Sequence, residues 1–155
     1  MRTKKLIEAA VIASVYAVLT IALAPLSYGV MQVRVSEALT VLPALTSAAI
    51  PGLFAGCLIA NMVGPYGLPD MIVGGTATLV AAFFSRMLRN RSLLVPLPPT
   101  VINGIAVGML LHYGYGVPLP LFICIGWVTL GQIVSCYGLG YPLLKILKNY
   151  KNLFV

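Results

Sequence analysis

Four polar side chains stand close together between two apolar segments of this sequence, and they are its clearest candidates for chemistry. They fall within residues 32–37 and are Gln32, Arg34, Ser36 and Glu37. The set combines a cation, a carboxylate, an amide and a hydroxyl, so it offers both hydrogen-bond donors and acceptors. Fixed polar groups of this kind are what a small polar ligand needs to exchange its hydration shell for protein partners.

The surroundings of this cluster are those of an integral membrane protein. Of the 155 residues 60% are hydrophobic and 8% are charged, whereas soluble proteins carry about 25% charged residues. The net charge of +7 is therefore interpreted first as membrane topology and not as a nucleic-acid surface. We expect residues 1–155 to form a single transmembrane substrate-binding domain in the lipid bilayer, with no nucleic-acid partner.

Apolar segments divide the chain into its expected helices. The first, residues 6–24, is about 19 residues or roughly 28 Å of helix, which spans a bilayer, so we interpret it as a retained helix and not as a signal peptide. Residues 39–63 fit either one long helix or two short ones, with a turn signal at Pro51 and Gly52. Three more apolar segments follow, at residues 71–85, 93–111 and 119–144.

The basic residues decide between five and six helices. With six helices and a cytoplasmic N-terminus, all but one of the 10 basic residues share the cytoplasmic side: Arg2, Lys4, Lys5, Arg86, Arg89, Arg91, Lys145, Lys148 and Lys151. A single helix over residues 39–63 would move the later clusters to the outer side and remove this bias. We therefore predict an all-α integral membrane protein, a six-transmembrane-helix bundle with both termini cytoplasmic.

The same topology brings further polar residues to the outer side, where Arg34 lies. They are Asn61, Asp70, His112 and Tyr113, and two amides, Asn103 and Gln132, lie within later helices. A buried amide in a membrane helix needs a partner, which is either another helix or a substrate. Arg34 and Glu37 stand three residues apart, so they either neutralise each other on a helix or face a ligand.

Several motifs are absent from the sequence. It has no G-x-x-x-x-G-K-[ST] loop, so the chain does not hydrolyse a nucleotide by the P-loop route. It also lacks H-E-x-x-H and G-x-S-x-G, and its three cysteines form no C-x-x-C pair. We expect no enzyme activity, catalytic residue, cofactor or metal, and a binding protein that takes its energy from partner subunits fits these absences.

Four segments of the chain resemble the QueT family. They are A-P-L-S-Y-G-V-M-Q-V-R-V-S-E-A-L-T-V-L-P (24–43), G-C-L-I-A-N-M-V-G-P-Y-G-L-P-D (56–70), P-L-P-P-T-V-I-N-G (96–104) and L-G-Y-P-L (139–143). That family is regarded as the substrate-binding S components of energy-coupling factor (ECF) transporters for queuosine precursors. The resemblance implies a six-helix, multi-pass protein of a bacterial plasma membrane, whose outer loops enclose the substrate.

The resemblance also implies partner subunits. An S component docks on a transmembrane coupling subunit and two ATPase subunits, and it topples in the membrane to release its substrate inside. An A-x-x-x-A motif on the first helix, which maps here onto Ala9 and Ala13, would contact the coupling subunit. Small residues at this spacing let another helix approach closely, so the alternative is packing inside the chain itself.

The implied ligand is a 7-deazaguanine type base. Its Watson–Crick edge carries adjacent N–H donors beside a carbonyl acceptor, which suit a carboxylate and a cation or amide respectively. We hypothesise Glu37 or Asp70 for the donors, Arg34, Gln32 or Asn61 for the carbonyl, and a tyrosine or Trp127 for the ring face. The full set of candidate ligand contacts is Gln32, Arg34, Ser36, Glu37, Asn61, Asp70, Asn103, Tyr113, Trp127 and Gln132.

Other functions stay open at this point. The chain could be an S component for another vitamin or small polar heterocycle, a stand-alone permease or channel, or a membrane sensor or scaffold. A requirement for ATPase partners during uptake separates the S component from the permease. Absence of any small-molecule binding would mark the sensor or scaffold.

Overall fold

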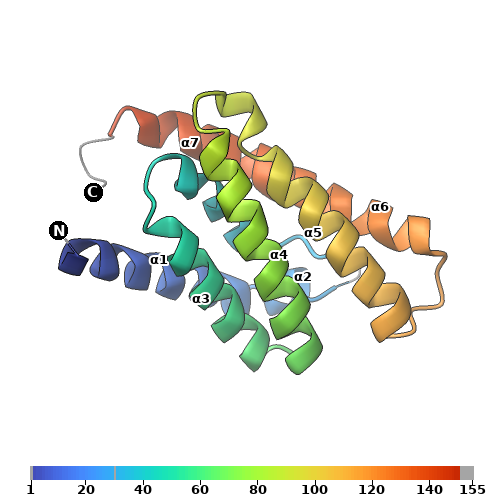
Figure 1. Cartoon of the computed structure of the whole chain (residues 1–155). Helices are drawn as coiled ribbons and strands as arrows, with labels where there is room; N and C mark the ends of the chain where they lie inside the picture. Colours follow the sequence, from blue (N-terminus) through green and yellow to red (C-terminus); the bar gives the residue numbers. More distant parts are fainter. Residues whose placement is uncertain (1, 30, 151–155) are drawn as a thin grey trace.

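The computed structural model describes residues 2–29 and 31–150, and every regular element in these ranges is a helix (Figure 1). The α-helices are α1 (Arg2–Ala22), α2 (Ala24–Ser27), α3 (Ala49–Val63), α4 (Leu68–Met87), α5 (Leu97–Met109), α6 (Leu121–Gln132) and α7 (Tyr141–Lys148). Two 3₁₀ segments, η1 (Val35–Ala44) and η2 (Ser92–Leu94), and two π-helical segments, η3 (Leu110–Gly114) and η4 (Ile133–Gly140), complete them. The predicted all-α class is confirmed.

Four helical segments of the described chain are long and apolar enough to cross a membrane. They are Thr3–Ala22, Leu68–Met87, Ser92–Gly114 and Leu121–Lys148. The third joins η2, α5 and η3, and the fourth joins α6, η4 and α7. Two shorter apolar helices, η1 and α3, lie between the first and second of these. The apolar helices agree with a membrane protein, whereas six crossings and cytoplasmic termini stay predictions.

Residues 39–63 contain two short helices and not one long one. The break lies at residues 45–48, where Thr46 N–H still donates to Leu42 O (3.0 Å) but α3 begins only at Ala49. The turn expected at Pro51 and Gly52 is therefore misplaced, because both lie in the first turns of α3. A proline is tolerated there, since the first N–H groups of a helix have no partner within it.

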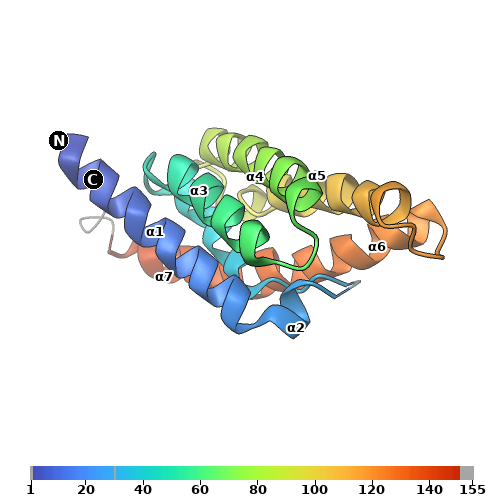
Figure 2. The same cartoon turned by 90° about the horizontal axis from the view of Figure 1, so that it is seen from below.

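The bundle has two layers with η1 between them. Seen from below, α3, α4 and α5 lie on one side, and α1 and the α6–α7 rod lie on the other (Figure 2). The η1 segment packs against α1, α3, α4, α7 and η4. The polar stretch at residues 31–37 is thus carried into the centre of the bundle and not left on an outer loop.

Small residues hold α1 and α3 close together. A Cβ atom added at Gly52 would lie 2.8 Å from Ala9 O, and one added at Gly56 would lie 2.8 Å from Ala13 O. The stripe of Ala9 and Ala13 therefore packs on α3 within the chain. Its additional role as a docking surface stays a prediction.

We expect Gly56→Ala to destabilise the protein by about 1 to 3 kcal/mol, because the added methyl group has no room between α1 and α3. The measurement is the midpoint of thermal unfolding in detergent. Gly126→Ala is the matched control, since a Cβ at Gly126 in α6 meets no atom within 4 Å. An equal midpoint for both variants would contradict the tight α1–α3 contact.

Candidate functional site

The segment that follows α2 carries its polar side chains inward. Gln32, Arg34, Ser36 and Glu37 are 2%, 4%, 0% and 1% exposed. The chain turns sharply at Gln32, whose φ of 46° is uncommon for a residue with a side chain. Gly131 of α6 makes this path possible, because a Cβ there would lie 2.0 Å from Met31 O. A strained backbone held by close packing is typical of binding sites.

Arg34 forms an ion pair with Asp70 inside the bundle. Its Nη2 lies 3.5 Å from Asp70 Oδ2, its Nε donates to Ser27 O (3.1 Å), and its guanidinium lies 5.4 Å from the centre of the Tyr28 ring. Asp70 is positioned by α4, where it follows Pro69 in the first turn and lies at the positive end of the helix dipole.

Local pairing of Arg34 with Glu37, one of the two alternatives for these residues, is not seen among the described residues. Arg34 precedes the first residue of η1 and has extended backbone angles, φ −89° and ψ 105°. Its side chain is therefore not held on the helical face that carries Glu37. The ion pair forms instead with a residue of α4, far away in the sequence.

Three tyrosines cover this ion pair. Tyr115 donates to Asp70 Oδ1 (2.6 Å) and stacks on Tyr66, with ring centres 4.3 Å apart and planes at 17°. Tyr66 in turn donates to Tyr28 O (3.4 Å). Burial, and then the hydrogen bond to Asp70 and its charge, raise the pKa of Tyr115. Its hydroxyl is thus a stable donor at neutral pH.

Glu37 is held by hydrogen bonds from two different helices. Tyr16 of α1 donates to Glu37 Oε1 (2.5 Å), and Asn103 of α5 donates to Glu37 Oε2 (3.2 Å). The same Asn103 amide group lies 3.5 Å from Gln132 Oε1 of α6. Glu37 therefore connects η1 with α1 and, through Asn103, with α5 and α6.

These side chains surround one small polar cavity. Its volume is about 10 Å³, which is room for about one water molecule, so a larger ligand requires the lining to move. Its wall includes five of the predicted contacts and three further residues: Gln32, Arg34, Glu37, Asn103 and Gln132, with Gly74, Thr78 and Val107. Two buried atoms of this wall, Gln32 Nε2 and Asn103 Oδ1, have no hydrogen-bond partner among the described residues.

Two predicted contacts lie close to the cavity but serve the scaffold. Asn61 donates through Nδ2 to Asp70 O (2.8 Å), while its buried Oδ1 accepts no hydrogen bond from a described residue. Ser36 and Thr20 share a hydrogen bond of 2.6 Å between their hydroxyls, which ties η1 to α1. Asn61 thus positions the start of α4, and Ser36 fixes the start of η1.

Two other predicted contacts are not brought to the cavity. Tyr113 is 73% exposed and Trp127 is 40% exposed, and neither lines the polar cavity. The aromatic rings that do lie at the site are those of Tyr28, Tyr66 and Tyr115. His112 is bonded through Nδ1 to Leu119 O (2.9 Å), as expected for a satisfied residue near the interface.

Three residues at or near the cavity were not predicted from the sequence: Tyr16, Gly74 and Gly131. Tyr16 stands among mostly apolar residues in the middle of α1 and is fully buried. A buried tyrosine hydroxyl needs a hydrogen-bond partner. The tyrosine in this apolar surrounding therefore indicated a contact with Glu37 or another acceptor. Gly131 directly precedes Gln132, but nothing in the sequence shows that the backbone of Met31 passes against it.

Comparison with known proteins places the chain among transporters. Residues 6–149 match the model of a family described as QueT transporter. Over 92 residues the chain is 34% identical to the queuosine precursor transporter QueT of Lactococcus lactis subsp. cremoris strain MG1363. The aligned residues make up 58% of this chain and 54% of the relative. The chain thus spans about half the length of that relative. No solved structure matches the chain.

We expect Asp70→Asn to lower the free energy of unfolding by about 3 to 5 kcal/mol, because it leaves the buried Arg34 without its counter-charge. Glu8→Gln is the matched control. The Glu8 carboxylate oxygens are buried and have no hydrogen-bond or ion-pair partner in the described part of the chain, so its neutralisation removes no ion pair seen there. Thermal unfolding in detergent compares the two, and a loss in the Glu8 variant as large as that of Asp70→Asn would refute the role of the pair.

Proposed function

The chain belongs to the QueT transporter family, and from this premise we propose that it is the membrane substrate-binding S component of an ATP-driven ECF importer. It captures a queuosine precursor, a 7-deazaguanine type base, on the outer side. It then delivers the base inside by docking and toppling on an energising module. The relative from Lactococcus lactis, which is named as a queuosine precursor transporter, supports this substrate class.

The observation that carries the proposal is a polar cavity in the centre of an apolar bundle. Its wall holds the charged groups of Arg34 and Glu37 and two unpartnered polar atoms, on Gln32 and Asn103. A buried polar group without a partner costs about 1 to 3 kcal/mol. A ligand that supplies both missing partners recovers this free energy when it binds.

The contacts favour one of the two carboxylates as the acceptor for the N–H donors of the base. Asp70 does not line the cavity, and its two oxygens are held by Arg34 and by Tyr115. Glu37 lines the cavity, and its bond from Asn103 is the longer of its two, at 3.2 Å. We assign the N–H donors of the base to Glu37 and Asn103 Oδ1, and we assign Asp70 to holding Arg34.

The remaining roles follow from the free donor and the aromatic rings. Gln32 Nε2 donates its unused N–H groups to the carbonyl of the base, and Arg34 lies beside that carbonyl. Gln132 accepts a hydrogen bond from Asn103 and so orients it. Tyr66 and Tyr115 form the cover that separates when the base enters, because their stack and the bond to Asp70 lie over the ion pair. Either ring then offers a face for stacking.

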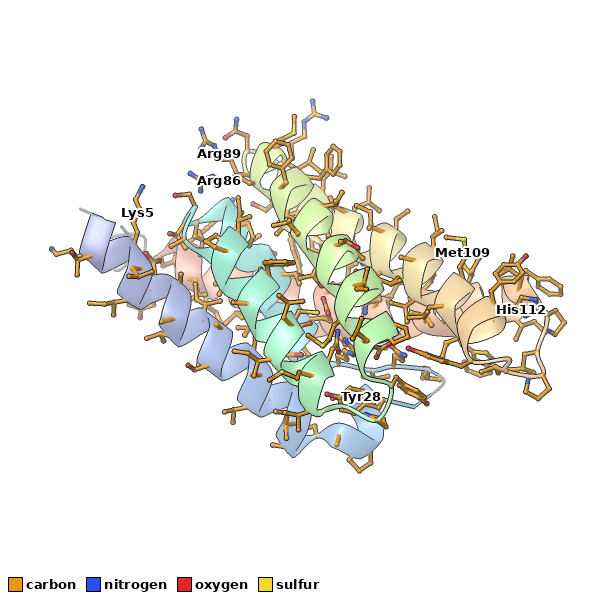
Figure 3. All side chains as sticks on the ribbon, turned by 60° about the horizontal axis from the view of Figure 1, so that its bottom comes forward. Lys5, Tyr28, Arg86, Arg89, Met109 and His112 are labelled. Carbon is orange, nitrogen blue, oxygen red and sulfur yellow. The ribbon has the colours of Figure 1, made fainter. Side chains whose placement is uncertain are left out.

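The proposed topology is a single domain of six transmembrane helices in a bacterial plasma membrane. Lys5, Arg86 and Arg89 lie toward one end of the bundle, whereas Met109 and His112 lie toward the other (Figure 3). Clustering of basic residues at one end supports a cytoplasmic location for that end. The N-terminus and the end of α7 would then both be cytoplasmic.

The proposed contact with the coupling subunit lies on α1. Ala13 is buried against α3, while Ala9 borders a surface groove of about 270 Å³ lined by Lys5, Leu6, Ala9, Ser47, Ala48 and Pro51. Ala9 is thus the member of the pair that a partner helix can reach directly. Ala13 supports the docking surface by fixing the distance between α1 and α3.

We expect Glu37→Gln to weaken binding of a 7-deazaguanine base by about 2 to 4 kcal/mol, because one or two charge-assisted hydrogen bonds are lost. Isothermal titration calorimetry of the detergent-solubilised protein measures the change. Tyr113→Phe is the control, since Tyr113 lies outside the cavity and should bind normally. Unchanged affinity of the Glu37 variant would show that Glu37 does not contact the base. If the unaltered chain bound a different heterocycle and no 7-deazaguanine base, the proposed substrate would be wrong.

Uptake of the labelled base should require the partner subunits. Cells that produce this chain with a coupling subunit and two ATPase subunits are expected to accumulate the base, and cells with an ATPase subunit inactivated in its phosphate loop are not. The binding affinity of the purified chain should be the same in both cases. Equal accumulation without active ATPase subunits would favour a stand-alone permease.

A further inference from the structure

An uncompensated cluster of arginines lies at the end of α4. Arg86 stands in the last turn of that helix, and Arg89 and Arg91 follow it at the surface. In the described part of the chain the only ion pair is that of Arg34 with Asp70. The remaining acidic groups do not compensate this end, because Glu37 lies in the central cavity and the Glu8 oxygens are buried without a partner.

Two grooves flank the same turns of α4. One, of about 350 Å³, has a wholly apolar lining: Phe84, Met87, Leu88, Leu97, Pro98, Val101 and Ile102. The other, of about 430 Å³, is lined by Ser47, Ile50, Phe83, Arg86, Met87, Arg89 and Asn90. Met87 borders both, so the grooves are neighbours, and the arginines stand only in the second. Hydrocarbon surface and positive charge thus meet at the end of one helix.

We propose that this surface binds one anionic diacyl phospholipid. One acyl chain lies in the apolar groove beside Phe84 and Val101, and the second lies beside Phe83 and Ile50. The phosphate is held by Arg86 and Arg89, whose guanidinium groups suit phosphate oxygens in geometry and charge. Basic pockets between helices at the cytoplasmic side of a membrane are typical sites for such headgroups.

A hydrogen bond within the protein holds Arg86 in position for this contact. Its Nη1 donates to Pro43 O of η1 (2.9 Å), which holds the guanidinium in place. A guanidinium has five N–H donors, so donors remain for the phosphate. Arg89 is exposed and makes no ion pair with a described residue. One arginine is thus fixed and the other is free to close on the headgroup.

The apolar groove distinguishes a lipid from a free phosphate or an acidic protein surface. A free phosphate would use the arginines alone and would be indifferent to the residues that line the apolar groove. An acidic protein surface would likewise need the charge but no hydrocarbon chains. A phospholipid uses both parts, so its binding must depend on Arg89 and on Val101 together. The proposal involves no residue of the central cavity.

Native mass spectrometry of the full chain in detergent tests this proposal, with dioleoyl phosphatidylglycerol as the anionic probe and dioleoyl phosphatidylcholine as the zwitterionic one. We expect tighter binding of phosphatidylglycerol, and a loss of about fivefold in its affinity for Arg89→Gln, since one basic residue near a membrane contributes about 1 kcal/mol. Val101→Trp, which fills the apolar groove, should weaken both lipids. Lys4→Gln is the control, because it removes a positive charge at the same end of the bundle but outside the two grooves. It should change the affinity for phosphatidylglycerol little.

Each alternative result has a definite meaning. Equal affinity of Arg89→Gln and the unaltered chain for phosphatidylglycerol would overturn the proposal, as would an equal loss in the Lys4 variant. If Val101→Trp left lipid binding intact while inorganic phosphate competed with the lipid, the site would be one for free phosphate. Thermal unfolding of each variant without added lipid shows that it is folded, and it should match that of the unaltered chain.

Discussion

The burial of two charged clusters among apolar helices is the constraint on which this structure depends. An isolated ionised side chain in such surroundings is costly, so each charge must be met by partners from other helices. Arg34 is met by Asp70, the Ser27 carbonyl and the Tyr28 ring. Glu37 is met by Tyr16 and Asn103. These contacts join the 31–37 segment to α1, α4 and α5, and they determine where it lies.

Close packing makes these contacts possible. Gly52 and Gly56 let α1 approach α3, which brings Tyr16 within reach of Glu37, and Gly131 lets the backbone at Met31 pass against α6. The result is a cavity whose wall comes from segments far apart in the sequence. Because its space admits only about one water molecule, the structure resembles a closed form. Ligand entry is therefore expected to separate the layers near Tyr66 and Tyr115.

Much of this organisation could be predicted from residue types. Hydropathy indicated helices in a membrane, and the amides Asn103 and Gln132 were expected to need partners, which they find partly in each other. The partners of Arg34 and Tyr16 could not be predicted, because they depend on contacts between α4, α1 and η1 that no local spacing encodes. The break at residues 45–48 was missed since Pro51 and Gly52 were the stronger turn signals. The ring face was assigned to a tyrosine or Trp127 without deciding between them, because aromatic residues near helix ends look alike in sequence.

The most direct test of the proposed binding site is an experimental structure of the protein with a 7-deazaguanine base bound. We predict a planar ligand in an enlarged cavity, with its N–H edge on Glu37, its carbonyl near Gln32 and Arg34, and Tyr66 and Tyr115 displaced from their present stack. A base bound elsewhere, with the contacts of Glu37 to Tyr16 and Asn103 unchanged, would contradict this prediction. In that case the buried polar cluster would serve only to hold the helices together.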